Sequence, residues 1–151
     1  MFNKFHIITP CFNNQKFLDD CIKSIENQNY PKEFIKMTII DDNSEIPLKT
    51  EETSFFLKII RNNKRMHPAY NRFLAYSTCN DYDIIIFLDG DDWLSDNKCL
   101  SLLNKIYNEN DIKWSVSNHK IFKNNKIKII PSFVDLPLEL EKPKICHLRC
   151  G

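Results

Sequence analysis

Short apolar runs alternate with helix-period segments along most of the chain. The runs are rich in β-branched and aromatic residues and lie at 5–9, 36–40, 56–60 and 84–88. They are apolar on both faces, which is typical of parallel strands covered by helices on both sides. The alternation of strand and helix therefore predicts an α/β fold with a mostly parallel sheet.

Three amphipathic helices are expected between and after these strands. Each is marked by apolar residues spaced three or four positions apart. The expected buried stripes are Phe17, Leu18, Cys21, Ile22 and Ile25; Tyr70, Phe73, Leu74 and Ser77; and Cys99, Leu102, Leu103 and Ile106. Asn13 or Asn14 is placed to cap the first helix, and Pro68 suits the first turn of the second.

The pattern changes in the last part of the chain. The strand-like sequences KWSVS and KIKIIPS flank the polar pair Asn124-Asn125, which predicts a β-hairpin, and proline-punctuated sequence follows. We therefore expect a single domain, with its core at 1–111 and a hairpin and the start of a further region at 112–151.

The charge balance argues for a local rather than a global binding site. Lysine and arginine number 21 and the acids 20, so the formal charge is +1 and no overall field attracts nucleic acid. No apolar stretch approaches the roughly 20 residues of a membrane span, and the amino terminus does not resemble a signal peptide. The expected location is the cytoplasm, with peripheral attachment to a membrane left open. The six cysteines are interpreted as reduced.

Polar residues follow three of the four predicted strands. The carboxyl ends of parallel strands meet at one edge of a sheet, where ligands bind in α/β folds. The residues at these ends are Thr9, Pro10, Cys11, Phe12 and Asn13; Asp41, Asp42, Asn43 and Ser44; and Asp89, Gly90, Asp91 and Asp92. We therefore expect at least four carboxylates to face one crevice.

The crowded carboxylates predict a metal site. They repel one another unless a cation or a proton resolves the repulsion. The spacing of Asp89 and Asp91 suits a hard divalent cation, Mn2+ or Mg2+, which prefers oxygen ligands and shares its shell with substrate phosphates. Gly90 between them lets the backbone turn tightly and a ligand come near. A single Asp-Gly turn needs no function, but a second acid pair after another strand favours a site.

Other acid-rich sites fit less well. A calcium-binding EF-hand loop starting at Asp89 would need glycine and glutamate where Leu94 and Leu100 stand. A dehalogenase-type phosphatase usually carries its acids on the first strand. The main alternative is a receiver-like signalling domain, with Asp41 and Asp42 as its acid pair and Asp89 as its phospho-acceptor, or another Mg2+-binding α/β domain.

Taken in order, the motifs resemble those of the family 2 inverting glycosyltransferases, which have the GT-A fold. HIITPCFNNQKFLDDCIKSIENQNYP is similar to the first strand, turn and helix of that family. IIDDNS resembles its second-strand acid pair, and FLDGDDWL resembles its Asp-x-Asp (DXD) metal motif. The resemblance covers about residues 4–107. It implies transfer of a sugar from a nucleoside diphosphate donor, a UDP-sugar above all, to a glycan, lipid or protein acceptor that the sequence does not identify.

The resemblance also implies roles for individual residues. Thr9, Pro10 and Asn13 would border the nucleoside, and Asp42 would accept a hydrogen bond from the base. Asp89 would face the ribose or the metal, and Asp91 would bind the metal that bridges the diphosphate. Arg65, in the basic segment before the predicted second helix, would contact the diphosphate.

Two departures from the family concern the second helix and the end of the chain. Pro68-Ala69-Tyr70-Asn71 stands where many members have Ala-Arg-Asn, so the arginine of that motif is missing. An inverting transfer also needs a general base. We expect this base beyond Gly151, because the three acids of the tail, Asp135, Glu139 and Glu141, are interpreted as surface residues. The sequence does not decide whether the chain forms a homo-oligomer.

Overall fold

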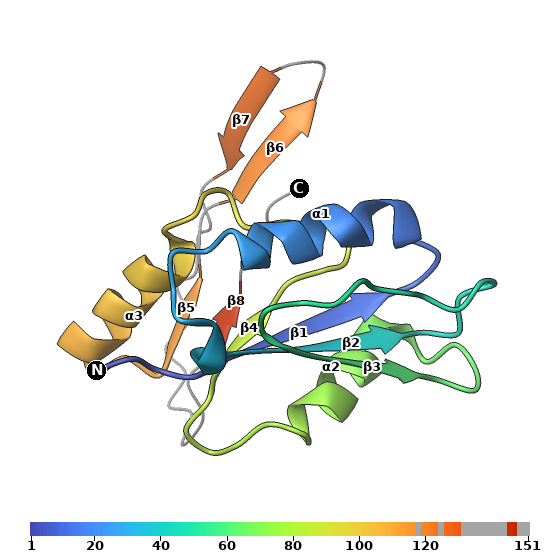
Figure 1. The fold of residues 1–151 in the computed structure, drawn as a ribbon, viewed down its shortest axis with the longest axis horizontal. Coiled ribbons are helices and arrows are strands. Elements are labelled where there is room, and N and C mark those ends of the chain that lie inside the picture. The colour runs from blue at the N-terminus through green and yellow to red at the C-terminus, as the bar shows by residue number, and fades with distance from the viewer. Residues whose placement is uncertain (117–118, 124–125, 131–144, 148–151) are drawn as a thin grey trace.

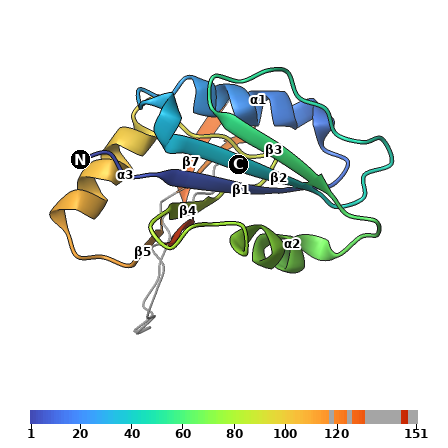
Figure 2. The ribbon, with the colours of Figure 1, turned by 60° about the horizontal axis from the view of Figure 1, so that its bottom comes forward.

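A computed structural model describes residues 1–116, 119–123, 126–130 and 145–147. A twisted sheet forms the central layer, with two helices on one face and a third on the other (Figures 1 and 2). The elements of the first part are β1 (Phe5–Cys11), α1 (Gln15–Glu26), a short 3-10 helix (Lys32–Phe34), β2 (Ile35–Asp41), β3 (Phe56–Arg61), α2 (His67–Tyr76), β4 (Ile84–Phe87) and α3 (Cys99–Glu109). The four strands and three helices expected before residue 111 are thereby confirmed.

The strand order places a switch point between β1 and β4. The six-stranded sheet has the order β3-β2-β1-β4-β8-β5, with β5 at Trp114–Val116 and β8 at Ile145–His147, and all its pairs are parallel. The chain runs from β1 to one side through β2 and β3, and then crosses to β4 on the other side. A ligand crevice is expected beyond the carboxyl ends of β1 and β4, where this order reverses.

The two faces of the sheet bury different amounts of apolar surface. Toward α1 and α3, a large core includes Ile7, Leu18 and Leu103. Toward α2, the buried cluster is small and consists of Ile8, Ile40, Ala75 and Ile85. The loss of exposed apolar surface is the main favourable term in folding, so the side that carries α1 and α3 contributes more to stability. Among the described helices, none is long and apolar enough to cross a membrane.

The stripe predicted for α2 was wrong. Tyr70 and Phe73 are 44% and 68% exposed, and the helix instead buries Asn71 and Ala75 against the sheet. A small alanine lets the helix lie close to the strands, and this leaves the aromatic side chains on the outer face. Leu102 on α3, also expected inside, is 57% exposed.

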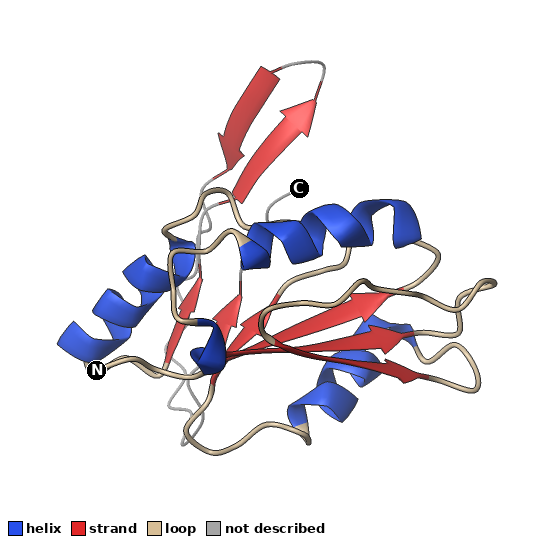
Figure 3. Cartoon of the chain, viewed as in Figure 1, coloured by secondary structure: helices blue, strands red, loops and turns tan. Residues whose placement is uncertain are grey.

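The hairpin prediction was half right. The hairpin strands are β6 (His119–Lys123) and β7 (Lys126–Ile130), which pair antiparallel on either side of positions 124–125, outside the described residues (Figure 3). KWSVS does not belong to the hairpin, because its central residues form β5 in the main sheet. The boundary at 111 stays a prediction, although β5 and β8 add strands from beyond it to the same sheet.

His6 gives the fold a predictable dependence on pH. Its side chain is buried, with Nε2 2.7 Å from Thr38 Oγ1, and burial followed by the charge of Lys36 lowers its pKa from 6.5 to about 4. The unfolded chain therefore binds a proton at a higher pH than the folded chain does. The stability due to neutral His6 is complete above about pH 7 and is lost as the pH falls from about 6.5 to about 4.

We expect the free energy of unfolding to drop by about 2 kcal/mol between pH 7 and pH 5 because of this residue. Urea denaturation at the two values measures the difference, and a His6→Gln variant serves as the control that lacks the titrating group. Equal pH slopes for the two proteins would show that His6 is not the source.

Candidate functional site

A cavity of about 260 Å³ opens at the switch point, beyond the carboxyl ends of β1 and β4. Four segments that are distant in sequence contribute to it: the end of β1, the residue after β2, the loop and start of α2, and the turn after β4. The lining residues are Pro10, Cys11, Phe12, Asn14, Asp42, Arg65, Pro68, Asn71, Asp89 and Asp91. The structure therefore confirms that these residues share one edge of the sheet, and a cavity lies at this edge.

A larger cavity, of about 480 Å³, lies elsewhere, between α1 and the loop that follows β4. Lys23 and Trp93 are among its lining residues. It does not contain the strand-end acids, so the smaller cavity is the candidate site.

Three carboxylates line the candidate cavity, rather than the four or more expected. They are Asp42, Asp89 and Asp91. Asp41 and Asp92 are buried and do not line it. Side chains alternate along a strand, so the end of β2 directs the adjacent acids Asp41 and Asp42 to opposite sides.

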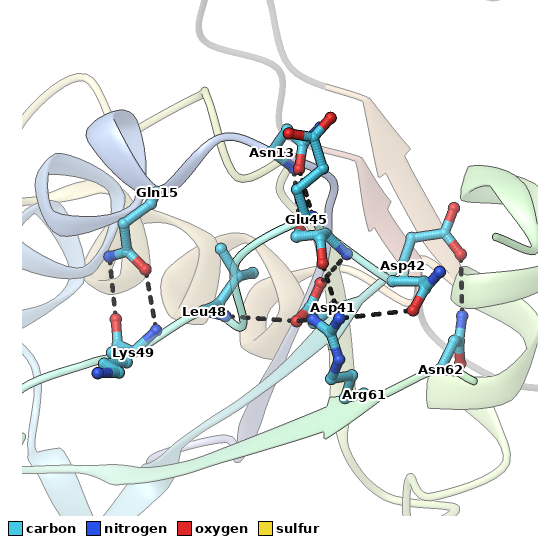
Figure 4. Close-up of polar contacts among 11 residues, drawn as sticks. Asn13, Gln15, Asp41, Asp42, Glu45, Leu48, Lys49, Arg61 and Asn62 are labelled. Atoms are coloured by element: carbon cyan, nitrogen blue, oxygen red, sulfur yellow. Dashed lines mark hydrogen bonds and ion pairs between the residues drawn. The ribbon is translucent and has the colours of Figure 1, made fainter. Parts of the chain in front are cut away.

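Asp41 serves the loop that follows β2. Its Oδ1 accepts from Ser44 N–H at 2.8 Å, and its Oδ2 accepts from Leu48 N–H at 3.3 Å and pairs with Arg61 (Figure 4). Burial alone would raise the pKa of Asp41, but the hydrogen bonds from Ser44, Arg61 and Leu48 lower it below its ordinary value. This acid is structural.

Asp42 holds the start of α2 against the cavity. Its Oδ1 accepts from Met66 N–H at 2.6 Å and from the Asn62 amide at 2.9 Å, and its Oδ2 accepts from His67 N–H at 2.9 Å. Burial would raise its pKa, but these donors, with Met66 the largest, lower it. Asp42 is therefore a charged, preorganised acceptor whose Oδ2 has room for a further donor.

Gly90 is required by close packing and not by its backbone angle. Its φ is not positive, but a Cβ at this position would collide with Cys11 Sγ and lie 2.8 Å from Asn14 Nδ2. The neighbours that come close are thus residues of the chain itself. This packing holds the turn between Asp89 and Asp91 against the end of β1.

Asp89 and Asp91 are the lining carboxylates that could hold a divalent cation. In the described part of the chain, no group of three or more His, Cys, Asp or Glu side chains could hold a metal alone. Mg2+ is commonly bound by one or two carboxylates together with substrate phosphates and water. The two acids therefore fit a cation shared with a diphosphate, and they do not fit a cation caged by the protein.

The remaining predicted residues divide between the cavity and its surroundings. Pro10 lines the cavity, as does Arg65, whose guanidinium lies 3.9 Å from the centre of the Phe12 ring. Thr9 is fully buried in the sheet, and Asn13 exchanges hydrogen bonds with Glu45, so neither lines the cavity.

Sequence reasoning missed Asn14 and Arg72. Asn14 lines the cavity, and its Oδ1 has no hydrogen-bond partner among the described residues. Arg72, on α2, forms an ion pair with Asp89. The signal in the sequence was a basic residue directly after Asn71, whereas the family motif has its arginine directly before this asparagine.

Together, the strand order and the acid-lined crevice define an α/β fold of the GT-A type. The model of the family "Glycosyl transferase family 2" matches residues 6–144, and the chain belongs to this family. The receiver-like alternative is wrong, since a receiver sheet has the order 2-1-3-4-5, whereas here β2 lies between β1 and β3.

Known relatives agree with this assignment. Poly(ribitol-phosphate) β-N-acetylglucosaminyltransferase TarS of Staphylococcus aureus strain Mu50 is 24% identical over 102 residues, which are 61% of this chain and 17% of TarS. The crystal structure of TarS 1–349 in complex with UDP-GlcNAc matches with a TM-score of 0.65 and 19% identity, over 76% of this chain and 34% of that one.

A mannosyltransferase from Pyrobaculum calidifontis, solved in complex with GDP-Man and Mn2+, shares the fold. Its TM-score is 0.60 at 18% identity, over 78% of this chain and 35% of that one. The chain thus spans about a third of these solved structures and about a sixth of the curated relative.

Proposed function

We propose that the chain is the donor-binding part of a glycosyltransferase that uses a nucleoside diphosphate sugar, a UDP-sugar above all, with inversion and with Mn2+ or Mg2+. The observation that carries the proposal is the convergence of Asp42, Asp89, Asp91 and Arg65 on one cavity at the switch point. Membership in glycosyl transferase family 2 supports the reaction class.

The charges of the cavity suit a diphosphate only in company with a cation. Asp89 and Asp91 would repel the phosphates, and a divalent ion held between acids and phosphates removes this repulsion. When bound, such an ion also stabilises the charge that develops on the departing nucleoside diphosphate. Arg65, exposed at the edge of the cavity, adds a guanidinium for phosphate oxygens.

We assign recognition of the nucleobase to Asp42. Its Oδ2 accepts from His67 N–H and has the capacity to accept from a ring N–H such as the imide of uracil. TarS has been solved with UDP and with UDP-GlcNAc, which supports a uridine nucleotide. The GDP-Man complex of the mannosyltransferase makes guanosine diphosphate the competitor to test.

The acceptor side is proposed for the full-length enzyme. Attack by an acceptor hydroxyl needs a general base. Asp135, Glu139 and Glu141, the acids of the tail, lie outside the described residues. The proposed setting is cytoplasmic, where nucleotide sugars are available.

Calorimetric titration with UDP, with and without Mn2+, tests the proposal. We expect binding to UDP that strengthens at least tenfold with Mn2+ and that exceeds binding to GDP and CDP. Asp42→Ala should weaken UDP binding about tenfold even without metal, the usual scale for losing a hydrogen bond to a charged group, whereas Asp91→Ala should weaken it only with metal present.

Asn62→Ala is the matched control for Asp42→Ala. It removes one donor to Asp42 while keeping the carboxylate, so it reports the cost of loosening the loop alone. If both variants lose UDP affinity equally, Asp42 orders the loop between β3 and α2 and does not recognise the nucleobase. If the wild type binds no nucleoside diphosphate, the proposed function is wrong.

A further inference from the structure

Arg72 compensates the charge of Asp89 without lining the cavity. Its Nη2 contacts Asp89 Oδ1, and each side chain is 28% exposed, so water screens the pair only in part. Asp89 lines the cavity and Arg72 does not. The guanidinium therefore acts on the ligand space through Asp89.

Among the described residues, the contact leaves a hydrogen-bonding atom of each side chain without a partner. Arg72 Nε is buried and has no hydrogen-bond partner in the part of the chain that the structure describes. An arginine that binds a carboxylate fully uses two parallel N–H donors. Here the bond runs from Nη2 to Oδ1, and no described residue donates to Oδ2, so Asp89 remains able to serve as a ligand.

We infer that Arg72 is a positioning residue that suppresses cation binding to the empty site and thereby couples cation uptake to the nucleotide. With Asp89 compensated, Asp91 is the carboxylate of the pair to which no described residue offers an ion pair, and a single carboxylate holds a hydrated divalent ion weakly. A nucleoside diphosphate supplies further oxygen ligands and negative charge. The inference rests on the proposed function, because it takes the diphosphate as the partner of the cation.

The coupling also has a kinetic advantage for the site. An ion that bound the empty acids tightly would have to be retained or displaced at each exchange of nucleotide. A charge already balanced by Arg72 instead lets cation and nucleotide enter and leave together. The reciprocity of linked binding then requires the cation to raise nucleotide affinity by the same factor as the nucleotide raises cation affinity.

Electron paramagnetic resonance of Mn2+, titrated into the protein without nucleotide, tests the inference. We expect Arg72→Gln and Arg72→Met to raise Mn2+ affinity about tenfold, since a neighbouring positive charge has been removed. The ratio of Mn2+ affinities with and without UDP should fall by a similar factor. Arg72→Lys keeps the charge and should stay near the wild type.

Lys64→Gln is the matched control, because Lys64 is an exposed cation of the loop before α2 and does not line the cavity. It should leave the Mn2+ affinity unchanged. Two variants of Arg72 are used so that one folded protein suffices, as judged by thermal melting.

If a folded Arg72→Gln or Arg72→Met protein binds Mn2+ as weakly as the wild type, while the wild type still binds UDP more tightly with Mn2+, this inference fails and the proposed function stands. A wild type that binds no UDP under either condition overturns both. A Lys64→Gln protein that gains affinity equally would show a general charge effect and would also overturn the role of Arg72.

Discussion

Replacing Asp91 with asparagine is expected to weaken metal-dependent binding of UDP by about 1.5 to 3 kcal/mol, which is about 10- to 150-fold. Asp91 is exposed at the cavity, and Asp89 is already paired with Arg72. Asp91 is therefore the acid whose full charge is available to a cation. The measurement is calorimetric titration of UDP at saturating Mn2+.

The stability of the ligand-free protein should not fall in the same variant. Asp89 and Asp91 lie two positions apart on one turn, and removing one charge relieves their repulsion. We expect the melting temperature without ligand to hold or rise. A variant that melts several degrees lower but binds UDP unchanged would show that Asp91 is structural and that the metal site has been misplaced.

Asp41→Ala is expected to lower the free energy of unfolding by about 2 to 6 kcal/mol, because each of two buried N–H groups left without an acceptor costs about 1 to 3 kcal/mol. Asp41 is 1% exposed, and its loss leaves two backbone N–H groups, of Ser44 and Leu48, without their acceptor. Arg61 also loses its ion pair. Urea denaturation followed by circular dichroism measures the change.

Arg61→Gln separates the two parts of this effect. Arg61 is 35% exposed and can be solvated, and Asp41 still accepts from Ser44 and Leu48 when the guanidinium is gone. We expect this variant to cost about 1 kcal/mol, as for a partly exposed pair. Equal losses for the two variants would show that the ion pair, and not the backbone acceptors, carries the stability of the loop.

Much of the fold was predictable because the sheet is covered on both faces. The run 84–88 is apolar at every position and 36–40 is rich in β-branched residues, while the intervening segments have helical spacing, so periodicity separated strands from helices. It worked for α1, where Leu18, Cys21, Ile22 and Ile25 of the predicted stripe are buried and only Phe17 is exposed. It failed for α2, whose aromatic stripe is exposed, because this helix faces the sheet through Asn71 and Ala75 instead.

The common edge of the site was likewise predictable. Residues that follow parallel strands must meet at one edge, and this rule placed Pro10, Asp42, Asp89 and Asp91 together. The general base is a different case, because the residues of the tail that could supply it lie outside the described part of the chain.

The sequence by itself thus determined the order of strands and helices, the edge at which polar residues gather, and the family. The first two follow from periodicity and from the direction of the chain, which are local properties, and the family follows from the resemblance of the ordered motifs. Only the tertiary structure decided what each acid does: Asp41 supports a loop, Asp42 holds the start of α2, and Asp89 pairs with Arg72. Such partners are brought within reach by the packing of α2 and the loops over the sheet, so a list of residues cannot specify them.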